Sequence, residues 1–167
     1  ISRLAKELKV KKIIYTSSCS VYGSGFKKKI NERTPIKPDS IYGVSKYAGE
    51  MFVEQILKNT STSTVIFRIF NTYGPGENLN FLKKGMISIY ASYIWKKKPI
   101  IVKGSLARVR NFQYVEDVVN ILVQSIKNKK LKKNEIINLT SGKKIKISKL
   151  IKLILLVNNK NMRYYKI

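Results

Sequence analysis

Short apolar runs alternate with longer amphipathic segments along this chain, and this alternation constrains the fold more than any other feature of the sequence. The runs at 13–17 and 64–70 are rich in β-branched and aromatic residues, which is typical of buried strands. The segments after them carry apolar residues at helical spacing. Strands that alternate with helices of ten or more residues indicate a parallel sheet with helices on both faces. We therefore predict an α/β fold.

The expected elements follow one another without an internal repeat or a flexible linker. A helix over 2–10 precedes the first strand, and a helix over about 42–59 precedes the second. Later in the chain we expect a helix at 82–95, strands at 99–103 and 111–115, a helix at 116–127, a strand at 136–140, and a helix capped by Ser148. For the helix over about 42–59 we expect a buried stripe of Val44, Ala48, Met51, Phe52 and Ile56.

The net charge of +25 raises nucleic acid or an anionic membrane as partners. Only six of the 34 basic residues are arginine, however, and arginine is the residue whose rigid fork suits phosphates and base edges. The lysines fall in separate clusters, at 27–29, 96–98 and 127–133. We therefore expect a solvated lysine-rich surface and no specific nucleic-acid partner. A basic nucleic-acid-binding module remains an alternative that charge favours and no motif supports.

Cysteine, histidine and apolar content narrow the class of protein further. Cys19 is the only cysteine, so an intramolecular disulfide is impossible and a reducing cytoplasm is the default location. The chain has no histidine, and we therefore expect no metal site. The aliphatic run at 153–157 is far too short to cross a bilayer, so we expect no membrane partner.

A tyrosine and a lysine four residues apart, Tyr42 and Lys46, begin the second predicted helix. Residues at this spacing lie on one helical face. A phenol is a poor base at neutral pH, but a nearby ammonium stabilises the phenolate. Tyr42 can then act as a general base or acid. Taken alone, such a pair is more often an ordinary surface contact.

A second group lies where ligands of open α/β sheets bind. Ser18 directly follows the strand at 13–17, and ligand sites in these folds lie at the carboxyl ends of strands. Taken alone, this serine would be read as a loop residue that bonds its own backbone. Its combination with Tyr42 and Lys46 favours a catalytic site.

Four segments in this order and spacing resemble the extended short-chain dehydrogenase/reductases, and within them the NAD-dependent nucleotide-sugar epimerase/dehydratase group typified by UDP-glucose 4-epimerase. The segments are YTSSCSVYG, YGVSKYAGE, FRIFNTYGPG and RNFQYVEDVV. The resemblance runs from Ile1 to about Ile154. It implies a partial Rossmann-like, doubly wound parallel sheet, plus part of a small C-terminal substrate-binding region. The implied domains are 1–73, which carries the catalytic residues, and 74–167, mainly substrate-binding and interleaved with the first.

The resemblance assigns roles to the residues already singled out. Tyr42 matches the catalytic tyrosine, and Lys46 matches the lysine that tunes it and hydrogen-bonds the nicotinamide ribose. Ser18 matches the residue that orients the sugar hydroxyl. In the family's reaction the tyrosine takes a proton from a sugar hydroxyl while hydride passes from the same carbon to NAD. An epimerase returns the hydride to the other face of the keto sugar.

Four more residues match cofactor or substrate contacts of the family. Phe70 matches the position beside the nicotinamide, and Asn71 the position beside the nucleotide sugar, although a buried aromatic and a turn-forming Asn also explain them. Arg110 matches the arginine that clamps the substrate pyrophosphate, with Arg108 leaving the register open. Val102 lies in the segment that matches the one flanking the nucleotide base. The implied substrate is a nucleotide sugar, chiefly a UDP-sugar.

Two positions depart from the family's dehydratases. Those enzymes carry Asp-Glu directly after the catalytic Ser/Thr, and the related decarboxylases usually keep the Glu, whereas this chain has Cys19 and Ser20. Elimination needs a positioned acid and base, which neither residue supplies at neutral pH. We therefore predict a 4-epimerase that serves polysaccharide biosynthesis, with a dehydratase or decarboxylase as the alternative.

The Gly-rich turn that holds the NAD pyrophosphate in this family is not found in the 167 residues. We expect it to be encoded upstream of Ile1, so that this chain is a fragment that is inactive alone. The helix at 42–59 resembles one that pairs across a homodimer in this family, which implies a homodimer for the full-length protein. Translating the DNA 5′ of the Ile1 codon tests this: an open frame with the motif supports it. A stop codon there would favour a decayed remnant that acts at most as a binding piece.

Overall fold

The computed structural model describes residues 1–24, 29–80, 85–131, 133–158 and 165–166. These residues form two compact units. The first unit combines 1–70 with 118–139, and the second combines 71–117 with 140–167. The units are therefore interleaved along the chain. The division into 1–73 and 74–167 stays a prediction.

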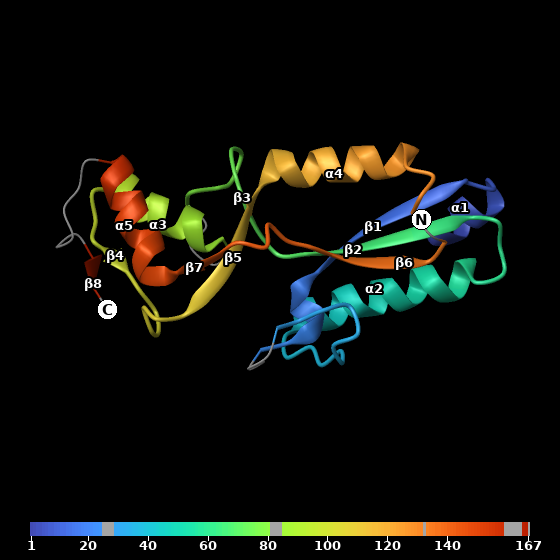
Figure 1. Cartoon of the computed structure of the whole chain (residues 1–167), viewed down its shortest axis with the longest axis horizontal. Coiled ribbons are helices and arrows are strands. Elements are labelled where there is room, and N and C mark those ends of the chain that lie inside the picture. The colour runs from blue at the N-terminus through green and yellow to red at the C-terminus, as the bar shows by residue number, and fades with distance from the viewer. Residues whose placement is uncertain (25–28, 81–84, 132, 159–164, 167) are drawn as a thin grey trace. The chain divides into compact units, whose positions relative to one another are not determined.

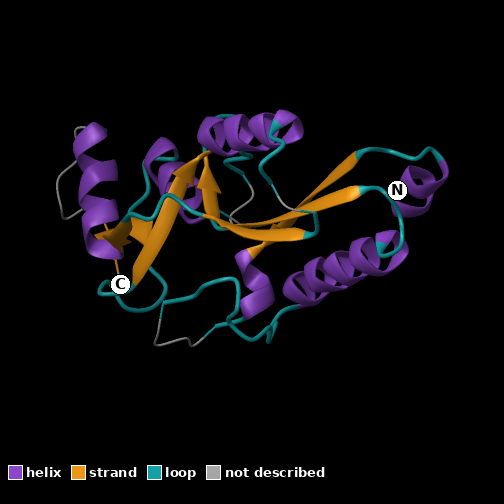
Figure 2. Cartoon of the chain, turned by 45° about the vertical axis from the view of Figure 1, so that its right-hand side comes forward, coloured by secondary structure: helices purple, strands orange, loops and turns teal. Residues whose placement is uncertain are grey.

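A parallel three-stranded sheet forms the centre of the first unit (Figure 2). Its strands, in spatial order, are β1 (Lys12–Ser18), β2 (Ser63–Ile69) and β6 (Glu135–Leu139). The helices of this unit are α1 (Ser2–Glu7), the 3-10 helix η1 (Cys19–Tyr22), α2 (Ile41–Leu57) and most of α4 (Val115–Lys127). Because the strands are parallel, their carboxyl ends meet at one edge, which is where Ser18 pairs with Ile69. The predicted α/β class and parallel sheet are confirmed.

Alternation along β2 sends its side chains to opposite faces of the sheet. Val65 and Phe67 pack with Val118 of α4, whereas Arg68 bonds Glu50 of α2. Figure 1 accordingly shows α4 on one face and α2 on the other. Both faces of this central strand are thus covered, which explains why its sequence is apolar almost throughout.

The buried face of α2 differs from the predicted stripe. Val44, Met51 and Phe52 are 53%, 49% and 66% exposed, so their prediction as core residues is wrong. The buried positions of α2 are Gly43, Glu50, Val53 and Leu57. The helix is rotated relative to the prediction because Glu50 finds a cationic partner in the sheet and is buried with it. The apolar side chains beside it are left on the surface.

The second unit contains a small mixed sheet and an apolar core. In the sheet, β3 (Asn71–Tyr73) runs parallel to β5 (Val109–Tyr114), and β7 (Lys144–Lys146) runs antiparallel to β5. The short strands β4 (Ile100–Ile101) and β8 (Tyr165–Lys166) pair with each other. The core lies between α3 (Met86–Trp95) and α5 (Ile147–Val157), with Tyr90, Ile94, Ile100, Val102, Ile147, Leu150, Ile151 and Leu155 buried.

Several boundaries in this unit differ from the predictions. Ser148 does not cap α5, because the helix begins one residue earlier, at the fully buried Ile147, and Lys146 precedes it without a side-chain cap. The strand expected at 99–103 is reduced to β4. The expected start of a helix at residue 82 lies outside the described residues, and α3 is described from Met86. No helix in the described ranges is long and apolar enough to span a membrane.

Candidate active site

Tyr42 lies in the first turn of α2, where a side-chain cap and a close backbone contact fix the helix. The Ser40 hydroxyl caps the helix by accepting the Gly43 N–H at 3.1 Å. A Cβ at Gly43 would lie 2.5 Å from the carbonyl oxygen of Ser20 in η1. Glycine therefore lets the start of α2 approach η1 closely. The Tyr42 side chain is 48% exposed at this position.

Ser18 ends β1 and caps the short helix η1. Its Oγ accepts the backbone N–H of Ser20 at 3.2 Å and donates to the Ser20 hydroxyl at 3.1 Å. The residue is buried, at 8% exposure, at the carboxyl edge of the parallel sheet. The capping bond fixes the direction of this hydroxyl, as orienting a substrate group requires.

Lys46 joins α2 to the end of β1 and lies close to Tyr42. Its Nζ donates to the Thr16 carbonyl at 2.9 Å and lies 5.8 Å from the centre of the Tyr42 ring. The same Nζ lies 5.6 Å from the centre of the Tyr15 ring, so the ammonium is within cation–π range of two phenols. The structure therefore brings together the tyrosine and lysine that the sequence paired.

Tyr15 is a member of this cluster that the sequence did not single out. Its hydroxyl donates to the Lys46 carbonyl at 3.3 Å, and a Cβ on Gly49 would lie 2.0 Å from that hydroxyl oxygen. Burial raises the pKa of Tyr15 above its usual value, and the neighbouring Glu50 and Tyr42 raise it further. The Tyr15 phenol thus stays protonated at neutral pH and can keep donating to α2.

Replacing Gly43 with Ala in the complete protein should lower both the melting temperature and kcat. The new Cβ meets a backbone oxygen that no rotamer can move away, so α2 must shift relative to η1. A displacement of about 1 Å can lower a rate by about 100-fold. Thermal melts and initial rates measure the two effects. Glu54→Ala, at an exposed position of the same helix, is the control, and equal behaviour of the two variants would contradict the packing argument.

The predicted residues near the end of β2 have defined backbone and side-chain partners. The Phe70 N–H donates to the Leu139 carbonyl at 3.1 Å, which continues the pairing of β2 and β6. Asn71 is exposed and begins β3, where its Nδ2 donates to the carbonyl of Asn111 at 3.0 Å. The cofactor contact of Phe70 and the substrate contact of Asn71 remain predictions.

The two arginines of the second unit have different local partners. Arg108 donates to the carbonyl of Ser105 at 3.0 Å and also to that of Lys103, so it holds its own loop together. Arg110 is exposed on β5 and donates to the carbonyl of Val109 at 2.9 Å. The pyrophosphate contact of Arg110 remains a prediction. Val102 is 3% exposed in the apolar core, and its place beside a nucleotide base remains a prediction.

The sequence model of the NAD dependent epimerase/dehydratase family matches residues 1–140. This chain belongs to that family. Within the described residues, no three His, Cys, Asp or Glu side chains gather as a metal site would require. The resemblance seen in the four sequence segments is confirmed.

Individual epimerase/dehydratase relatives include both reaction types. A dTDP-D-glucose 4,6-dehydratase of Homo sapiens is 32% identical over 158 residues, which is 94% of this chain and 43% of that protein. A putative UDP-glucose 4-epimerase of Methanocaldococcus jannaschii is 30% identical over 92% of this chain and 49% of that protein. The chain thus spans about half the length of the curated relatives it matches.

Solved structures of family members confirm the partial Rossmann-type fold of this chain. The UDP-N-acetylglucosamine 4-epimerase from Methanobrevibacter ruminantium M1 matches with a TM-score of 0.87 and 25% identity, over 95% of this chain and 50% of that one. A UDP-glucuronic acid 4-epimerase from Bacillus cereus, solved with NAD, matches with a TM-score of 0.86 and 27% identity. The match covers 96% of this chain and 51% of that one. NAD is therefore the cofactor of the family, as predicted.

Proposed function

We propose that the complete protein is an NAD-dependent nucleotide-sugar 4-epimerase and that Ser18, Tyr42 and Lys46 form its catalytic centre. The observation that carries this proposal is the placement of Lys46, whose Nζ lies near the Tyr42 ring and bonds the end of β1. A phenol, an ammonium and a capped serine hydroxyl at the carboxyl edge of a parallel sheet suit reversible oxidation of an alcohol.

The residues present fit the cofactor. The ammonium of Lys46 has three N–H donors and uses one of them on the Thr16 carbonyl. Such an ammonium can also donate to the hydroxyls of a ribose. When bound, NAD supplies the hydride acceptor. Phe70 would lie beside the nicotinamide, as the family resemblance implies.

The proposed reaction moves one proton through Tyr42. Its phenolate accepts the proton of the sugar 4-hydroxyl, which Ser18 orients, while the C4–H bond breaks with loss of hydride and a 4-keto sugar forms. Return of hydride to the opposite face, with return of the proton from Tyr42, completes the epimerisation. Atoms and charge balance, because each group given up in the first half is restored in the second. Lys46 stabilises the phenolate by its charge.

Local side chains favour epimerisation over loss of water. Cys19 and Ser20 follow Ser18, and Ser20 bonds the Ser18 hydroxyl through both its backbone and its side chain. The carboxylate of Glu50 is 2% exposed and bound to Arg68, so it is not placed to protonate a leaving hydroxyl. A dehydratase would need an acid at this position.

The substrate-binding part of the proposal rests on the second unit. Arg110 would clamp the pyrophosphate of a UDP-sugar by charge-assisted hydrogen bonds. Asn71 and Val102 would contact the sugar nucleotide and the base, as the resemblance implies. The product class suits the synthesis of surface polysaccharide precursors in a reducing cytoplasm.

Mass spectrometry of the products separates the candidate reactions. The complete protein is incubated with NAD and, in separate reactions, UDP-glucose, UDP-glucuronic acid and dTDP-glucose. Epimerisation leaves the mass of the nucleotide sugar unchanged and adds a second chromatographic peak. Loss of water would show a dehydratase, and loss of carbon dioxide would show a decarboxylase. Either loss, without an epimer, would overturn the 4-epimerase proposal.

We further propose that α2 pairs with its copy in a homodimer. The helix exposes an apolar face in which Ile41 is 90% exposed and Phe52 66%, with Val44 and Met51 about half exposed. Burying such side chains against a second copy contributes about 25 cal/mol per Å² of apolar area. A symmetric helix pair presents the same face twice, as a two-fold dimer requires.

Replacing Phe52 with Glu should convert the dimer of the complete protein to a monomer. The substitution places a charge on the apolar face, where it must be desolvated on association. Light scattering after size-exclusion chromatography measures the mass. Trp95→Glu, at an equally exposed apolar position in the second unit, should leave the dimer intact. A Phe52→Glu variant that keeps the dimer mass would exclude this face as the interface.

A further inference from the structure

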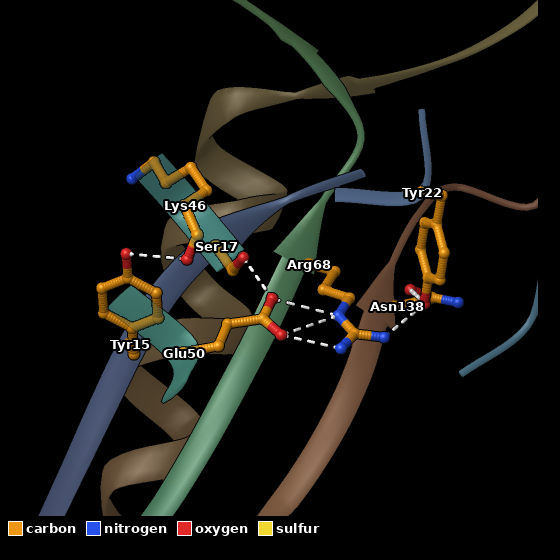
Figure 3. A network of polar contacts seen from close by, with 7 residues as sticks. All are labelled: Tyr15, Ser17, Tyr22, Lys46, Glu50, Arg68 and Asn138. Atoms are coloured by element: carbon orange, nitrogen blue, oxygen red, sulfur yellow. Dashed lines mark hydrogen bonds and ion pairs between the residues drawn. The ribbon is translucent and has the colours of Figure 1, made fainter. Parts of the chain in front are cut away.

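A buried ion pair lies between α2 and the central strand of the first unit. The Nη2 of Arg68 lies 2.7 Å from the Oε2 of Glu50, and the two side chains are 4% and 2% exposed. The Nε of Arg68 donates to the other carboxylate oxygen at 3.0 Å. Figure 3 shows the carboxylate of Glu50 facing the guanidinium edge of Arg68 in this paired arrangement. Two charges are therefore held out of water in a specific geometry.

The ion pair is the centre of a wider network. The Ser17 hydroxyl donates to Glu50, and Arg68 Nη1 donates to the Tyr22 hydroxyl at 2.9 Å. Tyr22 in turn donates to the side-chain oxygen of Asn138 at 2.7 Å. Burial lowers the pKa of Arg68, but the bonds to Glu50 and Tyr22 raise it more, so the guanidinium stays charged. One set of bonds thus joins α2, η1 and all three strands of the sheet.

This network lies one helical turn from Lys46 and directly beside Ser18. Glu50 follows Lys46 by four residues, so both occupy one face of α2. Ser17 precedes Ser18 and is aligned with Arg68 across β1 and β2. The network therefore bonds the two elements that carry the candidate catalytic residues: helix α2 holds Tyr42, and strand β1 holds Ser18.

The geometry of the pair suits a positioning role better than a purely stabilising one. Burying two charges costs several kcal/mol per ion, and an apolar pair of similar volume often gives equal or greater stability. Apolar contacts, however, are not directional. The fork of Arg68 and the carboxylate of Glu50 allow only a narrow range of relative positions. The network thus sets the register of α2 on the strand ends.

We propose that Glu50 and Arg68 are positioning residues that hold Tyr42 and Lys46 of α2 at a fixed distance from Ser18 at the end of β1. The proposal rests on the proposed function for its catalytic consequence. Its structural consequence, a fixed first turn of α2, is independent of which substrate the protein uses.

The experiment compares Glu50→Gln with a matched buried control in the complete protein. Glu50→Gln keeps the shape of the side chain and removes its charge. We expect kcat to fall by about 100-fold, since displacements of about 1 Å have this effect. KM should stay within about twofold, because the change acts on the reacting geometry and leaves substrate binding intact.

Thr64→Val is the control for a general loss of stability. Thr64 is 1% exposed on the same strand as Arg68, at the opposite end, where its hydroxyl donates to Asn134 at 2.7 Å. This variant should lower the melting temperature and keep kcat within about twofold of wild type. Unchanged kcat in Glu50→Gln, or an equal loss of kcat in Thr64→Val, would overturn the positioning role.

Two further measurements keep the test decisive. If Glu50→Gln does not fold, Ser17→Ala replaces it, and this milder loss of one bond should lower kcat by about tenfold; an unchanged kcat would overturn the proposal.

Amide hydrogen exchange at 42–46 gives a readout without substrate. It should accelerate in Glu50→Gln and stay unchanged in Thr64→Val. If the wild-type protein proves inactive on nucleotide sugars, the proposed function fails. Faster amide exchange at 42–46 in Glu50→Gln alone still supports the positioning role, whereas the same exchange rate in both variants overturns it.

Discussion

Replacing Tyr42 with Phe in the complete protein should lower kcat for epimerisation by about 10²–10⁴-fold, the usual contribution of a general acid–base group. The substitution removes only the hydroxyl, so the ring keeps its place 5.8 Å from Lys46 Nζ. NAD and nucleotide-sugar affinities should therefore change little. Steady-state rates give the loss in kcat, and calorimetric titration gives the two affinities.

Tyr47→Phe is the matched control for this loss. Tyr47 lies on the same helix five residues after Tyr42 and is half-buried. Removing its hydroxyl should leave kcat close to that of wild type. Unaltered epimerisation by the Tyr42→Phe variant would rule out the phenol as the proton carrier. Equal losses in both variants would indicate that the substitutions act through the helix and not through the reaction.

Replacing Arg68 with Met should lower the free energy of unfolding by about 3–5 kcal/mol, because it leaves the Glu50 carboxylate buried without its cation. Glu50 is 2% exposed, and Ser17 is the other group whose bond to it is seen. Urea denaturation of the complete protein, followed by circular dichroism, measures the change.

The double variant Arg68→Met/Glu50→Leu should recover most of this stability. Removing both charges also removes the desolvation cost, and the two apolar side chains can fill a similar volume. A double variant as unstable as Arg68→Met alone would show that packing, not the unpaired charge, causes the loss. The recovered protein should still be slow, since the directional bonds that fix α2 are gone.

The sequence predicted the strands and the catalytic pair because both depend on local patterns. The runs at 13–17 and 64–70 are apolar enough to be read as buried strands, and β1 and β2 lie within a residue or two of them. The spacing of Tyr42 and Lys46 fixes them on one helical face wherever the helix packs. These predictions therefore stay correct even where the predicted packing of the helices is wrong.

The rotation of α2 was not predictable from the same patterns. Periodicity identifies an apolar face, and Phe52 belongs to it, yet this face is exposed and Glu50 is buried. Burial of Glu50 depends on Arg68, which comes from a strand eighteen residues later. The spacing of residues within a helix cannot predict a partner that comes from a separate strand. The same limit applies to Tyr15, whose contact with Gly49 exists only between packed elements.

One signal in the sequence does point to this packing. Glycine within a helix costs about 1 kcal/mol relative to alanine, so its presence calls for a compensating reason. Gly43 and Gly49 both lie inside α2, and each permits a close approach, to η1 and to β1. Reading these two glycines as contact points would have shown which side of the helix faces the sheet.

The interleaving of the two units has a consequence for biosynthesis. Strand β6 pairs with β2, but the ribosome makes it only after the long segment 71–117 that belongs to the second unit. The sheet of the first unit therefore waits with an open β2 edge until residues 135–139 emerge. Non-local pairing of this kind slows folding. We expect nascent chains that stop before residue 135 to need chaperone protection, whereas chains that extend past β6 can complete this sheet.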